Sequence, residues 1–270
     1  EERFSRKKMD NSFPSHSIKY VLQEANIPLS EVDNIAYSWS KGLDKSLLKK
    51  YEERRNLAEK KGVNSFKIFL ERREWDQKRD LIVRQEFDQW VDKNIDLSNT
   101  EVLDYFHHEA HASSAALMSP FDNGIVLTAD GRGDGESTTI WSFNRNDPQC
   151  LSKIYSSFSC DSLGYFYGRI TGILGFKPMR HEGKITGLAA YGNPLIALPI
   201  MKKMIEVKEG KLIGNLGDYY RPFFSPYSDQ LIKELLPFSR EDIAAAAQLH
   251  LENCLYELLD FHLKNNEPKD

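Results

Sequence analysis

Three histidines stand close together in the segment DYFHHEAHASSAALM, at His107, His108 and His111. His107 and His111 are four residues apart, and on a helix this spacing places their Cβ atoms about 5–6 Å apart on one face. Two imidazoles at that separation can bind one cation together, whereas His108 points away from that face. The spacing by itself leaves open whether the pair binds a metal or lies on an ordinary helix surface.

The register of these histidines excludes the zinc-protease signature H-E-x-x-H. That signature needs a glutamate directly after the first histidine and a second histidine at the fifth position. Starting from His108, the second ligand position is Ala112. Starting from His107, the glutamate position is taken by His108.

The nearby segment ADGRGDGE carries Asp130 at the end of an apolar run, followed by Gly131, Gly133 and Gly135. Glycines let backbone N–H groups approach a phosphate because no Cβ stands in the way, and the carboxylate can meet the accompanying cation. The alternative is an Asp-Gly hairpin turn, which accounts for Asp130 and Gly131 but not for the residues that follow. The segment lacks the lysine of a P-loop, so that motif is excluded.

The spacing of apolar residues predicts the elements that position these side chains. Helical intervals predict helices over residues 14–27, 107–118, 162–176, 181–193, which ends before Pro194, and 239–265. The last of these opens with a capping box, Ser239 to Asp242. Apolar and β-branched runs predict a core strand at 32–39, a buried strand at 101–106, and a hairpin-like pair of strands over 123–144. The glycine-rich turn of this pair is built around Asp130 and the three glycines. Helices and strands alternate, which predicts an α/β fold.

Residues 43–95 are densely charged, with apolar residues such as Leu47, Tyr51, Phe69 and Phe87 at helical intervals. This pattern predicts two or three amphipathic helices inserted into the α/β frame. We expect their lysines and arginines to be solvated rather than to contact a phosphate-bearing partner.

The composition narrows the class of protein. A mean hydropathy of −0.53, without any apolar run near the roughly twenty residues that cross a bilayer, predicts a soluble chain. The net charge of −4 gives no general attraction to nucleic acid. Cys150, Cys160 and Cys254 have no paired spacing, which favours a reducing cytoplasmic compartment with each cysteine as a small buried hydrophobe.

The segment HHEAHASSAALMSPFDNGIVLTADGRGDGEST resembles the O-carbamoyltransferase family of the nodulation-factor and aminoglycoside-antibiotic type. Further segments resemble the family in the same order along the chain: EERFSRKK, SLGYFYGRITGILGF and HEGKITGLAAYGNP. Residues 43–94 match the family least, so we interpret them as lineage-specific.

The resemblance implies an ASKHA fold, that of actin-like ATPases, with mixed sheets flanked by helices. In the family, a second domain makes carbamoyl-adenylate from carbamoyl phosphate and ATP, and the ASKHA part passes the carbamoyl group to a hydroxyl of a sugar-like acceptor. In this chain the metal- and nucleotide-binding part would be residues 97–270. His107 and His111 fall on the family's metal-binding histidines, for Fe²⁺ or Mn²⁺, and Asp130 falls on the aspartate beside metal and nucleotide phosphate.

The resemblance and the chemistry leave two roles open for the predicted catalytic residue Asp130, which could hold the cation or accept the proton of the acceptor hydroxyl. The predicted nucleotide-binding residues are Asp130, Gly131, Gly133, Gly135, Gly164 and Lys184. For Lys184, a surface ion pair with its neighbour Glu182 is an equal alternative.

From the resemblance we expect that an opening hairpin, a third metal carboxylate and the adenylate-forming domain of the family lie outside the given sequence. We therefore expect a fragment that binds nucleotide weakly and does not turn over carbamoyl phosphate by itself. The expected partners are carbamoyl phosphate and a small hydroxyl acceptor, without membrane or nucleic acid, and a homodimer is left open. Two other functions also stay open: a nucleotide-binding ASKHA module without transfer, and a relative of the tRNA threonylcarbamoyl-transfer enzymes, which the acidic charge disfavours.

Overall fold

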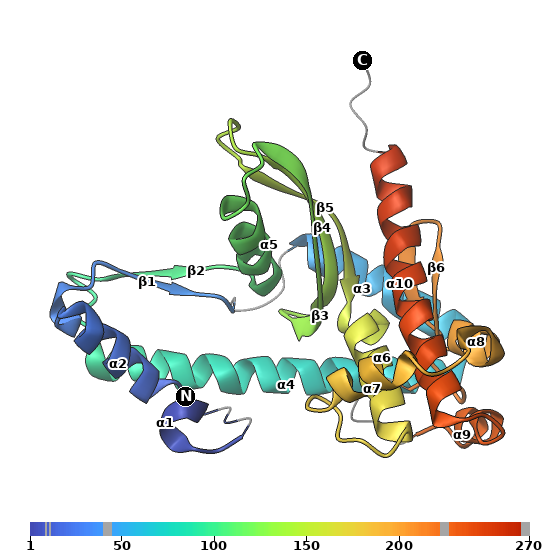
Figure 1. The fold of residues 1–270 in the computed structure, drawn as a ribbon. Helices are drawn as coiled ribbons and strands as arrows, with labels where there is room; N and C mark the ends of the chain where they lie inside the picture. Colours follow the sequence, from blue (N-terminus) through green and yellow to red (C-terminus); the bar gives the residue numbers. More distant parts are fainter. Residues whose placement is uncertain (9, 11, 40–44, 222–226, 266–270) are drawn as a thin grey trace.

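The computed structural model describes residues 1–8, 10, 12–39, 45–221 and 227–265. This part of the chain is an α/β protein in which helices surround three small sheets (Figure 1), so the predicted class is confirmed. The elements are α1 (Glu2–Ser5), α2 (Ser15–Ala25), η1 (Leu29–Glu31), β1 (Asn34–Tyr37), α3 (Lys45–Lys61), α4 (Val63–Asn94), β2 (Glu101–Asp104), α5 (His107–Leu117), β3 (Asn123–Gly133), β4 (Glu136–Asn144), β5 (Leu151–Phe158), η2 (Ser159–Asp161), α6 (Leu163–Ile173), α7 (Glu182–Ala189), α8 (Pro194–Lys202), β6 (Ile205–Lys208), β7 (Lys211–Gly214), α9 (Asp229–Leu235) and α10 (Arg240–Asn265). The described strands lie in separate sheets of two, three and two strands, and the ASKHA assignment stays a prediction.

The central sheet is antiparallel, with the order β3-β4-β5. Strands β3 and β4 form the predicted hairpin, and the turn lies within the predicted glycine-rich segment, at its last glycine rather than at Asp130. Asp134 and Gly135 occupy the turn with φ angles of 51° and 84°, the left-handed pair that a two-residue type I′ turn requires. Asp130 lies within β3, where pairing with β4 is interrupted between Ala129 and Gly133. The second Asp-Gly pair, not the first, therefore sets the register.

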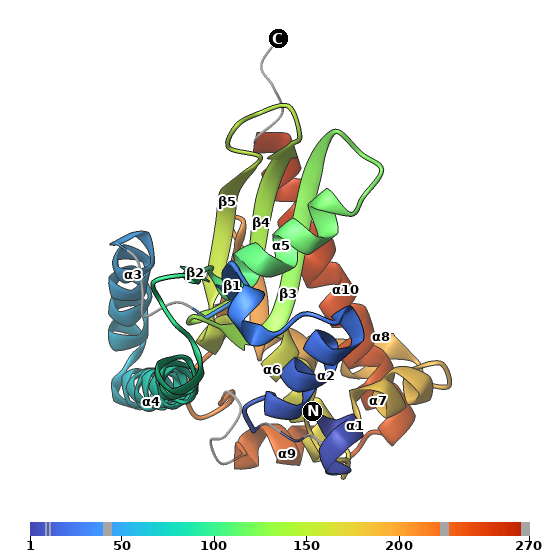
Figure 2. The same ribbon diagram turned by 90° about the vertical axis from the view of Figure 1, so that its left-hand side faces the viewer.

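Helix α5 covers one face of this sheet, and α10 lies behind the other face (Figure 2). The main core is on the α10 side, where α6, α7 and α8 pack against α10. Phe166 and Ile170 of α6 are fully buried there, and each stabilises the fold by about 1.5–3 kcal/mol through its removal from water.

The long C-terminal helix begins as the sequence predicts. The Ser239 hydroxyl accepts a hydrogen bond from the Asp242 N–H at 3.1 Å, which is one half of a capping box. The Asp242 carboxylate accepts the Asn193 N–H at 2.7 Å instead of closing the box, and so joins α10 to the start of α8. The helix predicted to end before Pro194 is shorter than expected, since α7 ends at Ala189. Pro194 instead opens α8, a position that suits proline.

The two parallel strands β1 and β2 lie apart from the central sheet, near the far end of α4 (Figure 1). The sequence predicts a core strand and a buried strand here, and both predictions are wrong about burial, since every residue of β1, β2 and α2 is half-buried or exposed. Apolar side chains such as Ile18, Tyr37 and Trp90 line a groove of about 500 Å³ between α2, β1 and α4. The apolar faces of α2, β1 and α4 face one another, but the groove between them leaves these faces partly exposed to solvent.

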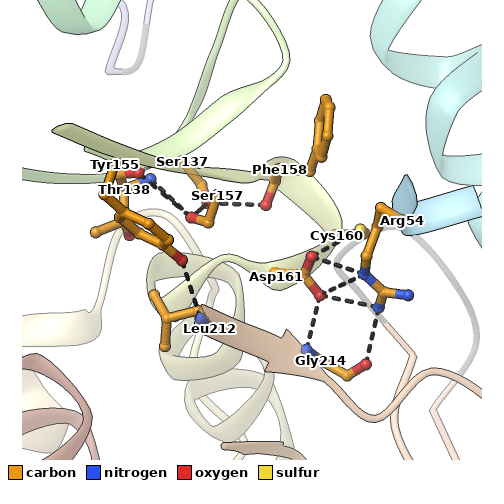
Figure 3. Close-up of polar contacts among 10 residues, drawn as sticks. All are labelled: Arg54, Ser137, Thr138, Tyr155, Ser157, Phe158, Cys160, Asp161, Leu212 and Gly214. Carbon is orange, nitrogen blue, oxygen red and sulfur yellow. Dashed lines mark hydrogen bonds and ion pairs between the residues drawn. The ribbon is translucent and has the colours of Figure 1, made fainter. Parts of the chain in front are cut away.

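The predicted helices of the charged region are α3 and α4, and the first two residues of that region lie outside the described residues. The expectation that its charges are solvated is wrong for Arg54, Arg72 and Arg84, whose side chains are at most 9% exposed. Arg54 donates from Nε and Nη2 to the Asp161 carboxylate at 2.8–3.0 Å, and from Nη2 to the Gly214 carbonyl at 2.9 Å (Figure 3). A buried guanidinium needs such a partner, so α3 is an integral part of the domain.

None of the described helices is both long and apolar enough to cross a membrane. All three cysteines are free thiols, and Cys160 and Cys254 are buried as expected. Cys150 is only partly buried, because it packs at the edge of a small cluster that contains Trp141 and Phe143.

Candidate metal centre

The side chains of His107, His111 and Asp130 meet at one point. Asp130 Oδ2 lies 3.0 Å from His107 Nε2 and 3.7 Å from His111 Nε2, and the two Nε2 atoms are 3.0 Å apart. At metal–ligand distances of about 2.0–2.2 Å, neighbouring ligands of one ion stand about 3–3.5 Å from one another. Two imidazole nitrogens and one carboxylate oxygen therefore converge at separations that suit a single cation.

The chemistry of this donor set fits the expected metal. Two histidines and one carboxylate on one side of an ion, with other positions open, are typical of non-haem iron(II) centres, and carboxylate ligands also suit Mn²⁺. The His107 side chain is 17% exposed, whereas those of His111 and Asp130 are 51% and 43% exposed. One side of the cluster is therefore open to a further ligand or substrate.

Hydrogen bonds hold Asp130 in its charged form. Burial opposes the charge, but the hydrogen bond from His107 and the one that the Gly131 N–H donates to Oδ1 outweigh it, so the pKa of Asp130 lies below its ordinary value. The Gly131 N–H thus binds Oδ1 of Asp130, whereas Oδ2 faces both imidazoles.

The turn of the β3–β4 hairpin holds the first histidine in place. Helix α5 begins at His107, and the side chain of the preceding Phe106 does not cap it. Asp134 Oδ2 accepts the His107 N–H at 2.7 Å instead. This bond satisfies an N–H group of the first turn and places negative charge at the positive end of the helix dipole. Asp134 is 3% exposed, so water competes little with the bond.

Gly133 leaves the space that the His107 ring fills. A Cβ at this glycine would stand 2.1 Å from His107 Cδ2, which is far inside van der Waals contact. Gly135 has the positive φ of the turn. Local packing therefore accounts for both glycines, and their role toward a nucleotide stays a prediction.

The first turn of α6 packs on the backbone of Asp130. The Ser162 hydroxyl donates to the Asp130 carbonyl at 3.0 Å and accepts the Tyr165 N–H at 3.0 Å as the N-cap of α6. Gly164 permits this approach, because a Cβ there would stand 3.0 Å from the Asp130 carbonyl, and a Cβ on Gly131 would stand 3.3 Å from the Tyr165 ring. A helix N-terminus in this place favours a nearby anion such as a phosphate.

His108 turns away from the cluster and into the protein. It is fully buried, and its Nδ1 lies 2.7 Å from Thr128 Oγ1. That hydroxyl lies 2.6 Å from Thr139 Oγ1, which accepts the Trp141 Nε1–H at 2.6 Å. Burial lowers the pKa of His108 to about 4, so the ring is neutral near pH 7. His108 therefore anchors α5 to β3 and β4.

Lys184 lies on α7, not on the elements that carry the cluster. Helix α7 packs against α6 and α10 (Figure 1). Lys184 is exposed, and its Nζ is 5.7 Å from the centroid of the Phe176 ring. The neighbouring Glu182 carboxylate accepts the Met179 N–H. The nucleotide-binding role of Lys184 stays a prediction.

Two residues beside the cluster lie outside the predicted set. Asp134 has a sequence signal, because it begins the second Asp-Gly pair between two apolar runs. The Trp39 ring lies 4.9 Å from the His107 ring, centroid to centroid. No local pattern predicts that contact, since the two residues are far apart in the sequence.

Comparison with known proteins shows the family of this chain. The family model described as carbamoyltransferase N-terminus matches residues 1–265. The chain therefore belongs to the carbamoyltransferase N-terminal family.

Individual relatives are longer than this chain. It is 29% identical over 270 residues to the nodulation protein NolNO of Sinorhizobium fredii, covering 97% of this chain and 36% of that protein. An uncharacterized protein of Synechocystis is 36% identical over 215 residues, which are 77% of this chain and 33% of that protein. An uncharacterized protein of Methanocaldococcus jannaschii is 29% identical over 264 residues, which are 96% of this chain and 42% of that protein. The matched regions thus span less than half of each of these relatives.

Replacing His108 with Ala should lower the free energy of unfolding by about 2–4 kcal/mol, because it opens a cavity and removes the partner of a buried hydroxyl. His111→Ala is the matched control on the same helix, since the His111 side chain is 51% exposed and surface changes stay within about 0.5 kcal/mol. Chemical denaturation of the metal-free, full-length protein measures both. Equal losses would contradict the anchoring role of His108.

Proposed function

We propose that this chain forms the metal-binding part of an O-carbamoyltransferase, which transfers a carbamoyl group to a hydroxyl of a sugar-like or natural-product acceptor. The donor is carbamoyl-adenylate, made from carbamoyl phosphate and ATP, and the cation is Fe²⁺ or Mn²⁺. One observation carries the proposal: His107, His111 and Asp130 converge in a member of the carbamoyltransferase family. A cytoplasmic location and a homodimer stay predictions.

The reaction needs an activated leaving group, because a carbamoyl carbonyl is a poor electrophile. A divalent cation, when bound, neutralises the phosphate of the departing nucleotide. His107 and His111 would hold it through their Nε2 atoms. The contacts of Asp130 support a role as ligand over that of general base, since its Oδ1 accepts the Gly131 N–H and its Oδ2 faces both imidazoles.

The N-terminus of α6 supports a phosphate position beside this centre. Ser162 holds the first turn of α6 on the Asp130 carbonyl, and Gly164 allows the close contact. The positive end of the helix dipole therefore lies next to the carboxylate that would bind the cation. A nucleotide phosphate placed there would lie near both the cation and the positive end of the α6 dipole. For Gly131, Gly133, Gly135 and Lys184, the nucleotide-binding role rests on the family resemblance alone.

In the full-length protein, His107→Ala and His111→Ala should each weaken Mn²⁺ binding by orders of magnitude, because each removes one of few protein ligands. His108→Ala should bind Mn²⁺ nearly as well as the wild type, since its ring points into the interior. Titration of Mn²⁺, followed by the electron paramagnetic resonance of the free ion, measures all three. Metal binding that is lost equally in all three variants, or kept in both ligand variants, would refute the assignment.

Full-length protein supplied with ATP, radiolabelled carbamoyl phosphate and a panel of sugar-like hydroxyl acceptors should form a carbamoylated product. Asp130→Asn should abolish transfer but leave carbamoyl-adenylate formation intact, because we assign adenylation to a separate domain. Both steps can be followed by chromatography of the label. Nucleotide binding without transfer to any acceptor would favour the ASKHA module without transferase activity, and transfer of a threonylcarbamoyl group to tRNA would favour the tRNA-modifying alternative.

A further inference from the structure

A buried arginine lies on the same strand as the metal carboxylate. Arg132 sits between Asp130 and Asp134, the two residues whose carboxylates contact His107. Its side chain is 7% exposed and crosses from β3 to α4. There its Nη1 lies 2.5 Å from Asp80 Oδ1 and its Nε lies 3.3 Å from Asp76 Oδ1.

Asp76 also forms hydrogen bonds with other residues beside Arg132. Its side chain is 2% exposed, and it accepts hydrogen bonds from Arg72 Nη2 and from the Ser159 hydroxyl. Arg72 Nη2 also donates to the Tyr165 hydroxyl at 3.0 Å. Asp76 thus connects α4 with β3 and η2 directly, and with α6 through Arg72.

Aromatic rings enclose the same arginine. The Arg132 guanidinium lies 5.4 Å from the ring centroids of both Trp39 and Trp75. The Trp39 ring in turn lies 4.9 Å from the His107 ring. Little water can reach the ion pair of Arg132 with Asp76, whose side chains are 7% and 2% exposed, so the positions of both groups are strongly constrained.

The Arg132 contacts lie beside the part of β3 that is not paired with β4. Pairing of β3 with β4 is interrupted between Ala129 and Gly133, so the intervening residues have no regular rung to fix them. Such bulges redirect side chains, and something outside the ladder must then hold them. For this segment, the Arg132 contacts to α4 supplement the Ser162 contact to the Asp130 carbonyl.

We propose that Asp76 and Asp80 of α4 are positioning residues of the metal centre. They hold Arg132 so that Asp130 and Asp134 keep their places on either side of His107. The inference rests on the proposed metal site and assigns the charged helical region a part in it. Neither aspartate touches the cation or a reacting atom.

The test uses full-length protein, Mn²⁺ as the probe, and Asp76→Asn, which keeps the shape but removes the charge. Mn²⁺ affinity should fall about 10- to 100-fold, as for the loss of an outer-shell partner, and the electron paramagnetic resonance spectrum of bound Mn²⁺ should change. Asp88→Asn is the control on the same helix. It breaks the half-exposed pair with Arg84 and should change affinity by no more than about twofold.

If Asp76→Asn does not fold, Asp80→Asn gives the same test, because its side chain is 24% exposed and its loss is better tolerated. Folded aspartate variants with wild-type affinity and spectrum would overturn the positioning role alone, provided that His107→Ala abolishes binding in parallel. A wild-type protein whose Mn²⁺ binding does not depend on His107 would overturn the proposed metal site and this inference with it. Equal losses in Asp76→Asn and Asp88→Asn would show only a general structural effect and so overturn the positioning role.

Discussion

The bond between the Asp134 carboxylate and the His107 N–H is the constraint on which the candidate centre depends. It joins the tip of a β-hairpin to the first residue of a helix, so one contact sets both the start of α5 and its distance from β3. Gly133 lets the His107 ring lie against the strand, and His108 secures the same helix turn from the interior side. Once α5 is fixed in this way, the four-residue spacing places His111 beside His107 and Asp130.

Buried ion pairs are a second feature of the structure. A guanidinium in the interior costs free energy unless a carboxylate meets it, and removal of one partner is more harmful than removal of both. Here Arg54 of α3 pairs with Asp161 of η2, and Arg132 of β3 pairs with Asp76 of α4. A long charged helix thereby becomes a support for the segment of β3 that carries Asp130.

The sequence predicted what local rules control. The helix from His107, the hairpin, the capping serine of α10 and the common face of His107 and His111 all follow from periodicity or spacing, and the structure has them. The segment ADGRGDGE predicts a turn but holds two Asp-Gly pairs, and local rules do not show which pair forms it. The buried state of Arg54 and the contact of Trp39 with His107 were missed because they depend on tertiary pairing between distant segments. Strand β1 was expected in the core because apolar spacing shows which face meets a partner but not how completely it is covered.

The most direct test of this account is the Mn²⁺ affinity of the full-length Gly133→Ala variant. The added methyl group would overlap the His107 ring, so we predict that affinity falls at least about tenfold. Gly124→Ala, on the same strand, has open space around the new Cβ and should bind as the wild type does. Wild-type affinity in Gly133→Ala would contradict the claim that this glycine and the hairpin place His107 beside Asp130.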